Sequence, residues 1–148
     1  MRKFIVISIV LLMIAGFVIT SSAKVVTLYA DQTIPVGTLT VEVVGTDLVV
    51  TYAITALCWV LGDTHLYIGD EKPTKSAPGQ FPYGPEVAVN GVYTIPLNGF
   101  TGTLYIAAHA EVTKTCDFLR EETAWARVCW LWSIRPGKNW ATYFEFYL

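Results

Sequence analysis

Hydrophobic and polar residues alternate with a period of two along much of the chain after residue 24. The alternation is clearest in two neighbouring segments, residues 38–44 and 48–54, which Gly45-Thr46-Asp47 separates. Because successive side chains of a strand point to opposite faces, each segment is predicted to form a strand with one apolar face and one polar face. A short connection with glycine between two such segments predicts a β-hairpin. We expect this hairpin to cover a core on one side and to meet water on the other.

Further segments are rich in Val, Thr, Tyr, Phe and Trp, which are the residues favoured on a pleated surface. They predict additional strands at residues 25–30, 57–61, 64–68, 91–97, 103–112 and 140–148. Residues 69–86 contain four prolines and are predicted to be a long loop, since proline cannot take part in a central strand. Residues 117–132 fit a short helix about as well as a loop followed by a strand.

Seven or eight strands joined by short turns, with no alternation of strands and helices, predict an all-β antiparallel fold. We expect a β-sandwich of the jelly-roll or immunoglobulin-like type, and a closed barrel is the alternative. Residues 24–148 fit the size of one domain.

Residues 1–23 have the composition of a cleaved signal peptide. Arg2 and Lys3 form a basic start, residues 4–19 form an apolar run, and small residues follow as far as Ala23. The alternative is an uncleaved membrane anchor, for which the apolar run is slightly short. We therefore expect a protein that is secreted or held at the cell surface, and that contacts the membrane only through an uncleaved leader.

The charge of the chain limits its partners. The formal net charge is −2 for the whole sequence and becomes −4 when Arg2 and Lys3 leave with the leader. No basic patch runs along the sequence, so nucleic acid is not expected as a partner. The same observation argues against a polybasic contact with an anionic membrane.

Three cysteines are present, and an odd number leaves one thiol over in an oxidising compartment. Cys116 and Cys129 flank one short segment and are the favoured disulfide pair. Cys58 lies in an apolar run and is expected to be a small buried hydrophobic residue. Spacing alone also permits pairing of Cys58 with either of the other two.

Two histidines are candidates for metal chemistry. His65 shares a strand face with Tyr67, and His109 shares one with Tyr105 and Glu111. If the two strands are neighbours, the imidazoles approach each other beside a carboxylate, which would suit zinc or copper. The candidate metal ligands are His65, His109, Glu111 and Glu122. The favoured alternative is that each histidine hydrogen-bonds a neighbouring polar group, because no close His–His spacing supports a chelate. No other cofactor is expected, although carboxylates beside the long loop offer a weaker calcium candidate.

Aromatic residues crowd the last quarter of the chain and recur in the long loop. Some must fill the core, because large side chains supply much of its buried area. Exposed rings would form a platform for a sugar or a contact for another protein. Together with the polar candidates, the predicted binding residues are His65, Tyr67, Phe81, Tyr83, Tyr105, His109, Glu111, Glu122, Trp125 and Trp140.

Catalytic motifs such as GxSxG, HExxH and a phosphate-binding glycine loop are absent from the sequence, so an enzyme is not expected. We expect function by binding or by assembly. Binding would be recognition of a surface glycan or protein by the loops and rings. Assembly would be self-association in a surface filament, in which residues 25–30 pair with the open edge of a neighbouring copy.

Five segments occur in an order that resembles a group of secreted domains of bacteria and archaea. They are THLYIG (64–69), PGQFPY (78–83), LYIAAHAEV (104–112), ETAWA (122–126) and NWATYFEFYL (139–148). The resemblance spans residues 36–148 and implies export and a shared fold, but no activity, since none is assigned to that group. The positions that it singles out are His65, Pro78–Phe81, His109, Glu122, Trp125 and Trp140.

Overall fold

The computed structural model describes residues 23–116, 118–128 and 132–148. Cys129 and residues 1–22 of the predicted signal peptide lie outside the described residues. Within the described part, the only helical element is the short 3-10 helix η1, Pro78–Gln80. A search of the same residues for a helix long and apolar enough to cross a membrane finds none.

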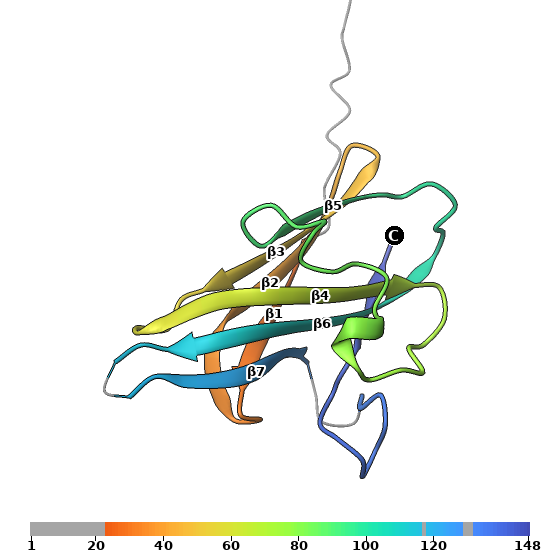
Figure 1. Ribbon diagram of the computed structural model, residues 1–148. Coiled ribbons are helices and arrows are strands. Elements are labelled where there is room, and N and C mark those ends of the chain that lie inside the picture. Colours follow the sequence, from red (N-terminus) through yellow and green to blue (C-terminus); the bar gives the residue numbers. More distant parts are fainter. Residues whose placement is uncertain (1–22, 117, 129–131) are drawn as a thin grey trace, which may run out of the picture.

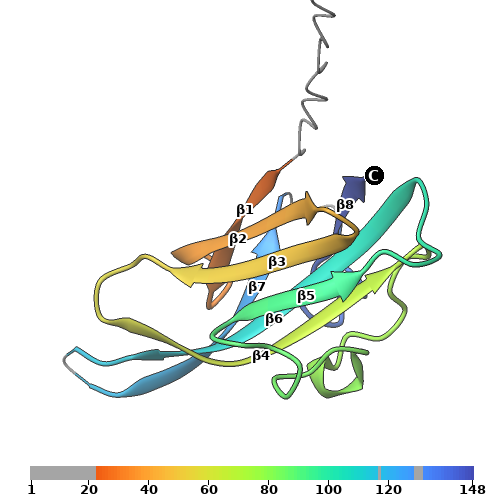
Figure 2. The same ribbon diagram turned by 90° about the horizontal axis from the view of Figure 1, so that it is seen from above.

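Eight strands form one antiparallel sheet that curls around its main core (Figures 1 and 2). The order along the sheet is β4-β6-β7-β1-β2-β3-β5, and β8 pairs with β6 at the end of β6 that β7 does not reach. Through the curl, β4, β6 and β7 form one layer, and β2 and β3 form much of the facing layer. The predicted all-β, sandwich-like antiparallel fold is therefore confirmed. The strands are β1 Lys24–Ala30, β2 Ile34–Val44, β3 Asp47–Ile54, β4 Trp59–Gly69, β5 Val92–Pro96, β6 Thr103–Lys114, β7 Arg120–Arg127 and β8 Phe144–Tyr147.

The predicted hairpin at residues 38–54 is formed by β2 and β3. The two strands pair in the register that places Val41 opposite Val50, and both side chains are buried. Burial of apolar area at about 25 cal/mol per Å² makes such alternating positions the main source of stability. The buried side chains of the hairpin are Val36, Leu39, Val41, Leu48, Val50 and Tyr52.

The predicted strands 57–61 and 64–68 form one strand, β4. It runs beside β6 with a register shift between Leu61 and Thr64. An irregularity of this kind bends a strand and increases its twist, so β4 follows the curl of the sheet without a break.

Strand β7 decides between the two alternatives for residues 117–132. Over Arg120–Arg127 the chain is extended and pairs with both β6 and β1, so the strand is confirmed and the helix is wrong. Ala124 and Ala126 face the main core. A helix here would have left the facing edges of β6 and β1 without partners.

Cys58 and Cys116 form a disulfide with their Cα atoms 5.4 Å apart. The expected Cys116–Cys129 pair is therefore wrong, and Cys58 is not an unpaired thiol. The cause is the pairing of β4 with β6, which places Trp59 opposite Lys114. The cysteine that precedes β4 and the cysteine that follows β6 are thereby brought together.

The two ends of the sheet, β4 and β5, meet at a seam that tyrosine side chains close. Tyr93 Oη on β5 donates to Thr64 O at 2.8 Å, and Tyr52 Oη donates to His65 O at 3.1 Å. Burial raises the pKa of Tyr52 and Tyr93, so both phenols keep the protons that they donate. Tyr83 also covers the edge of β4, since its backbone makes two hydrogen bonds to that strand. The backbone groups at this part of the β4 edge therefore already have partners and are not available to pair with another strand.

Candidate functional site

Most of the predicted site residues lie on the outer face of the β4-β6-β7 layer, which points away from the main core. Alternation along each strand produces this separation, because Leu66 and Ala108 face the core while the residues beside them face outward. The outward-facing members are His65, Tyr67, Tyr105, His109, Glu111 and Trp125.

Two segments cover the outer face and create a second apolar cluster on it. The long loop after β4 contributes Phe81, and the chain before β8 contributes Trp140 and Ala141. The Phe81 and Trp125 rings are 6.0 Å apart, and the Trp125 and Trp140 rings are 6.5 Å apart, both edge to face. Such pairs are favourable beyond the area that they bury, so the cover is held on the sheet by aromatic packing.

The C-terminal hairpin, residues 132–143, holds Trp140 in place. Backbone hydrogen bonds join its two arms. Thr142 Oγ1 donates to a carbonyl of β7 at 3.0 Å, and Asn139 Nδ2 donates to Ser76 Oγ at 2.7 Å. The hairpin is therefore attached to the sheet at one point and to the long loop at another.

His65 and His109 are direct partners in the ladder between β4 and β6. Their ring centroids are 5.7 Å apart, and the His109 ring is 5.1 Å from Trp125. Burial, and secondly the charge of His65, lower the pKa of His109 to about 4, so His109 is neutral at neutral pH. Among the described residues, the Nδ1 atom of each histidine is buried and has no hydrogen-bond partner. The predicted hydrogen bonds to neighbouring polar groups are thus not made at these atoms.

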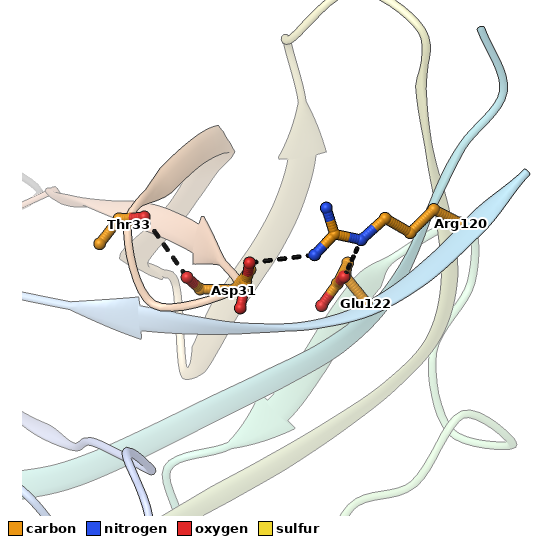
Figure 3. A network of polar contacts seen from close by, with 4 residues as sticks. All are labelled: Asp31, Thr33, Arg120 and Glu122. Atoms are coloured by element: carbon orange, nitrogen blue, oxygen red, sulfur yellow. Dashed lines mark hydrogen bonds and ion pairs between the residues drawn. The ribbon is translucent and has the colours of Figure 1, made fainter. Parts of the chain in front are cut away.

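The two candidate carboxylates are placed on different faces. Glu111 is exposed on the outer face, with the histidines. Glu122 lies opposite Val112, in register with the core-facing residues, and forms an ion pair with Arg120 (Figure 3). Arg120 Nη2 also lies 3.0 Å from Asp31 Oδ2. In the described ranges, no group of three or more His, Cys, Asp and Glu side chains is arranged to hold a metal ion.

Trp140 lines three hollows that are open to the surface. Two of them, of about 270 and 490 Å³, share Gln32, Gly137, Asn139 and Trp140. We call this continuous depression the Trp140 groove. Ser133 lines it, and Ser133 Oγ is buried with no hydrogen-bond partner within the described structure. A third hollow of about 160 Å³ lies between Trp140 and the His109–Trp125 row.

Several other aromatic candidates have structural contacts. Phe144 and Phe146 are buried in the main core, and Tyr83 packs against it. Tyr67 Oη donates to Glu71 O at 2.9 Å. The Tyr105 ring packs edge to face on Tyr143, with the centroids 6.1 Å apart. These rings stabilise the sheet and its cover. Tyr67 and Phe81 also line a hollow of about 240 Å³ beside the long loop, whereas Trp140 lines the Trp140 groove and the third hollow.

Sequence reasoning did not identify Gln32, Ser133 or Asn139 as lining residues. Asn139 is adjacent to Trp140, so an amide beside a tryptophan was an available signal. Gln32 lies in the turn between β1 and β2 with a φ of 64°, a conformation that few non-glycine residues adopt. Its proximity to Trp140 results from the folding of the chain and has no local signature.

No family model, curated protein or solved structure matches this chain. The resemblance of its motifs to secreted domains therefore stays a prediction, and function has to be argued from the geometry of the outer face.

Proposed function

We propose that this protein is an extracellular, non-enzymatic binding module that recognises a glycan in the Trp140 groove. The observation that carries the proposal is the presence, in one depression, of the half-buried Trp140 indole and the exposed Gln32 side chain. A sugar ring has an apolar C–H face and a rim of hydroxyl groups. An indole packs on the first, and amide or hydroxyl groups hydrogen-bond the second.

The polar residues of the groove fit this chemistry. Gln32 supplies an amide from the β1–β2 turn, and Lys138 supplies a cation to the lining of the groove. The two attachments of the C-terminal hairpin reduce the ordering that binding would require.

The extracellular location has two supports. The Cys58–Cys116 disulfide is typical of an oxidising compartment. The signal-like composition of residues 1–23 is the second. N-terminal sequencing of protein recovered from the producing cells tests the location. A mature chain that begins at Lys24 is the expected result, and retention in the cytoplasm would contradict it.

A glycan array followed by titration calorimetry tests the binding proposal. Trp140→Ala is expected to weaken binding at least tenfold, about 1.4 kcal/mol or more. Tyr147→Ala is the matched control, because Tyr147 is an aromatic residue that is 63 % exposed and lies on β8, away from the groove. The control variant is expected to bind as the parent protein does.

Two outcomes would reject the glycan groove. The first is an array without any bound glycan, and the second is a glycan whose affinity is the same in Trp140→Ala and in the parent. Circular dichroism of both variants establishes that each is folded, so that a loss of affinity is assigned to the groove.

Self-association by exchange of β1 is the alternative function and has less support. β1 pairs with β2 along its whole length and with β7 over Thr27–Ala30. The three-residue turn Asp31–Thr33 joins β1 to β2 within one chain. Exchange would have to break both ladders before new ones formed. Electron microscopy of concentrated protein tests this alternative, and filaments would favour it over the groove.

A further inference from the structure

His65 and His109 lie opposite each other in the β4–β6 ladder with ring centroids 5.7 Å apart, and the Nδ1 atom of each is buried without a hydrogen-bond partner among the described residues. We propose that His65 and His109 bind one monovalent copper ion, Cu⁺, through their Nδ1 atoms. The site is separate from the Trp140 groove, because neither histidine lines the groove. Loss of one site would leave the other intact.

The separation of the two rings fits one shared ion. Two imidazoles that share an ion through nitrogen–metal bonds of about 2 Å, with each ring centre roughly 1 Å behind its nitrogen, have centroids about 6 Å apart. The His65 and His109 centroids are 5.7 Å apart, with the rings tilted by 49°. Because the two residues are opposite each other in the β4–β6 ladder, backbone pairing sets this separation.

The Nδ1 atoms lack the hydrogen bonds that buried polar atoms normally make. Neither bonds to the other ring or to any other described residue. Such exceptions are costly, and a bound ion is one of the recognised explanations for them. One ion between the rings would satisfy both lone pairs at once.

The number of ligands favours Cu⁺ over other ions that imidazole binds. Zn²⁺ takes four ligands in proteins, whereas Cu⁺ is a soft ion that two nitrogen donors in line can satisfy. In the described parts of the chain, no third His, Cys, Asp or Glu side chain completes a larger set. Both Nδ1 atoms are shielded from solvent, so water does not readily supply the remaining positions of a Zn²⁺ site.

Titration of the full-length protein with Cu⁺ against a chromogenic Cu⁺ chelator, without oxygen, tests the site. One Cu⁺ per chain is expected, and His65→Ala and His109→Ala are each expected to weaken binding at least a hundredfold. Zn²⁺ is expected to bind at least a hundredfold more weakly than Cu⁺. X-ray absorption of the loaded protein is expected to show two nitrogen ligands. Quenching of tryptophan fluorescence gives an independent signal, because Trp125 lies 5.1 Å from the His109 ring.

Two controls keep the test decisive. Cys129→Ser removes the third cysteine, a residue type that also binds Cu⁺, and this variant is expected to bind as the parent does. His65 is only partly buried, so His65→Ala decides the question if His109→Ala does not fold. Unchanged affinity in His65→Ala, loss of binding in Cys129→Ser, or equal affinity for Zn²⁺ and Cu⁺ would overturn the proposal.

Discussion

His109 lies directly opposite His65 across the β4–β6 ladder, and Trp125 continues the same row on β7. A proton on His109 would therefore lie between a second imidazole and an indole, with His109 only 4 % exposed to water. This arrangement explains why burial and the neighbouring histidine together lower the pKa of His109.

The stability of the metal-free protein is expected to depend on pH through His109. Its pKa is about 4 in the folded state against 6.5 in the unfolded chain, so the unfolded state binds more protons between these values. The contribution of neutral His109 to the free energy of unfolding is therefore complete above pH 6.5. It falls by about 3 kcal/mol as the pH is lowered to 4.

Urea denaturation at several pH values in the presence of a chelator measures this effect. Between pH 6.5 and 4, His109→Phe is expected to lose about 3 kcal/mol less unfolding free energy than the parent protein. Carboxylate effects are common to both proteins and cancel in the comparison. Parallel stability profiles for the variant and the parent would contradict the assignment.

The Cys58–Cys116 disulfide closes a long loop, with a sequence separation of 58. Cys58→Ser is expected to lower the free energy of unfolding by up to about 4 kcal/mol, because the cross-link restricts the unfolded chain. Cys129→Ser is the matched control and is expected to have little effect. Thermal or urea denaturation of both variants gives the comparison. A larger loss of stability in Cys129→Ser than in Cys58→Ser would instead support a Cys116–Cys129 disulfide.

The seam between β4 and β5 is expected to depend more on Tyr93 than on Tyr52. The Tyr93 hydroxyl contacts both Thr64 O and Thr64 Oγ1 at 2.8 Å, whereas the Tyr52 hydroxyl has one partner, His65 O. Tyr93→Phe is expected to cost about 2–3 kcal/mol and Tyr52→Phe about 1 kcal/mol in unfolding free energy. Equal losses in urea denaturation would show that the seam is closed by packing alone.

Replacement of Trp125 is expected to reduce mainly the stability of the protein, whereas replacement of Trp140 is expected to reduce mainly glycan binding. Trp125 is buried against the sheet, so Trp125→Ala is expected to cost about 3–5 kcal/mol of stability. Trp140 is half-buried at the edge of the groove, and Trp140→Ala is expected to cost clearly less. Calorimetric melting of the two variants makes the comparison. A larger loss for Trp140→Ala would make that residue part of the core instead of the groove.

Local patterns along the chain were sufficient to predict most strands. The hairpin of β2 and β3 follows from period-two alternation, which is a property of neighbouring residues alone. Residues 117–132 were ambiguous, because the periodicity of a short apolar segment does not by itself distinguish a helix from a strand. Pairing of β7 with β6 and β1 removed the ambiguity, and this pairing is a property of the whole sheet.

The sequence predicted which candidate residues of one strand share a face of that strand. Alternation placed His109 with Tyr105 and Glu111, and the structure has them on one face. Glu122 could not be placed from its own segment, because its face depends on the register of β7 against β6. The same limit applies to Gln32, whose turn reaches the Trp140 groove only in the folded chain.

The amino-acid sequence by itself determined which segments are extended and which side chains share a face, because both depend on interactions between residues close in the chain. Only the tertiary structure decided which strands are neighbours. That choice pairs Cys58 with Cys116, places His65 opposite His109 and brings Gln32 to Trp140. The physical reason is that strand order is selected by the burial of one shared core and by the pairing of backbone hydrogen bonds, and neither is encoded in a local pattern.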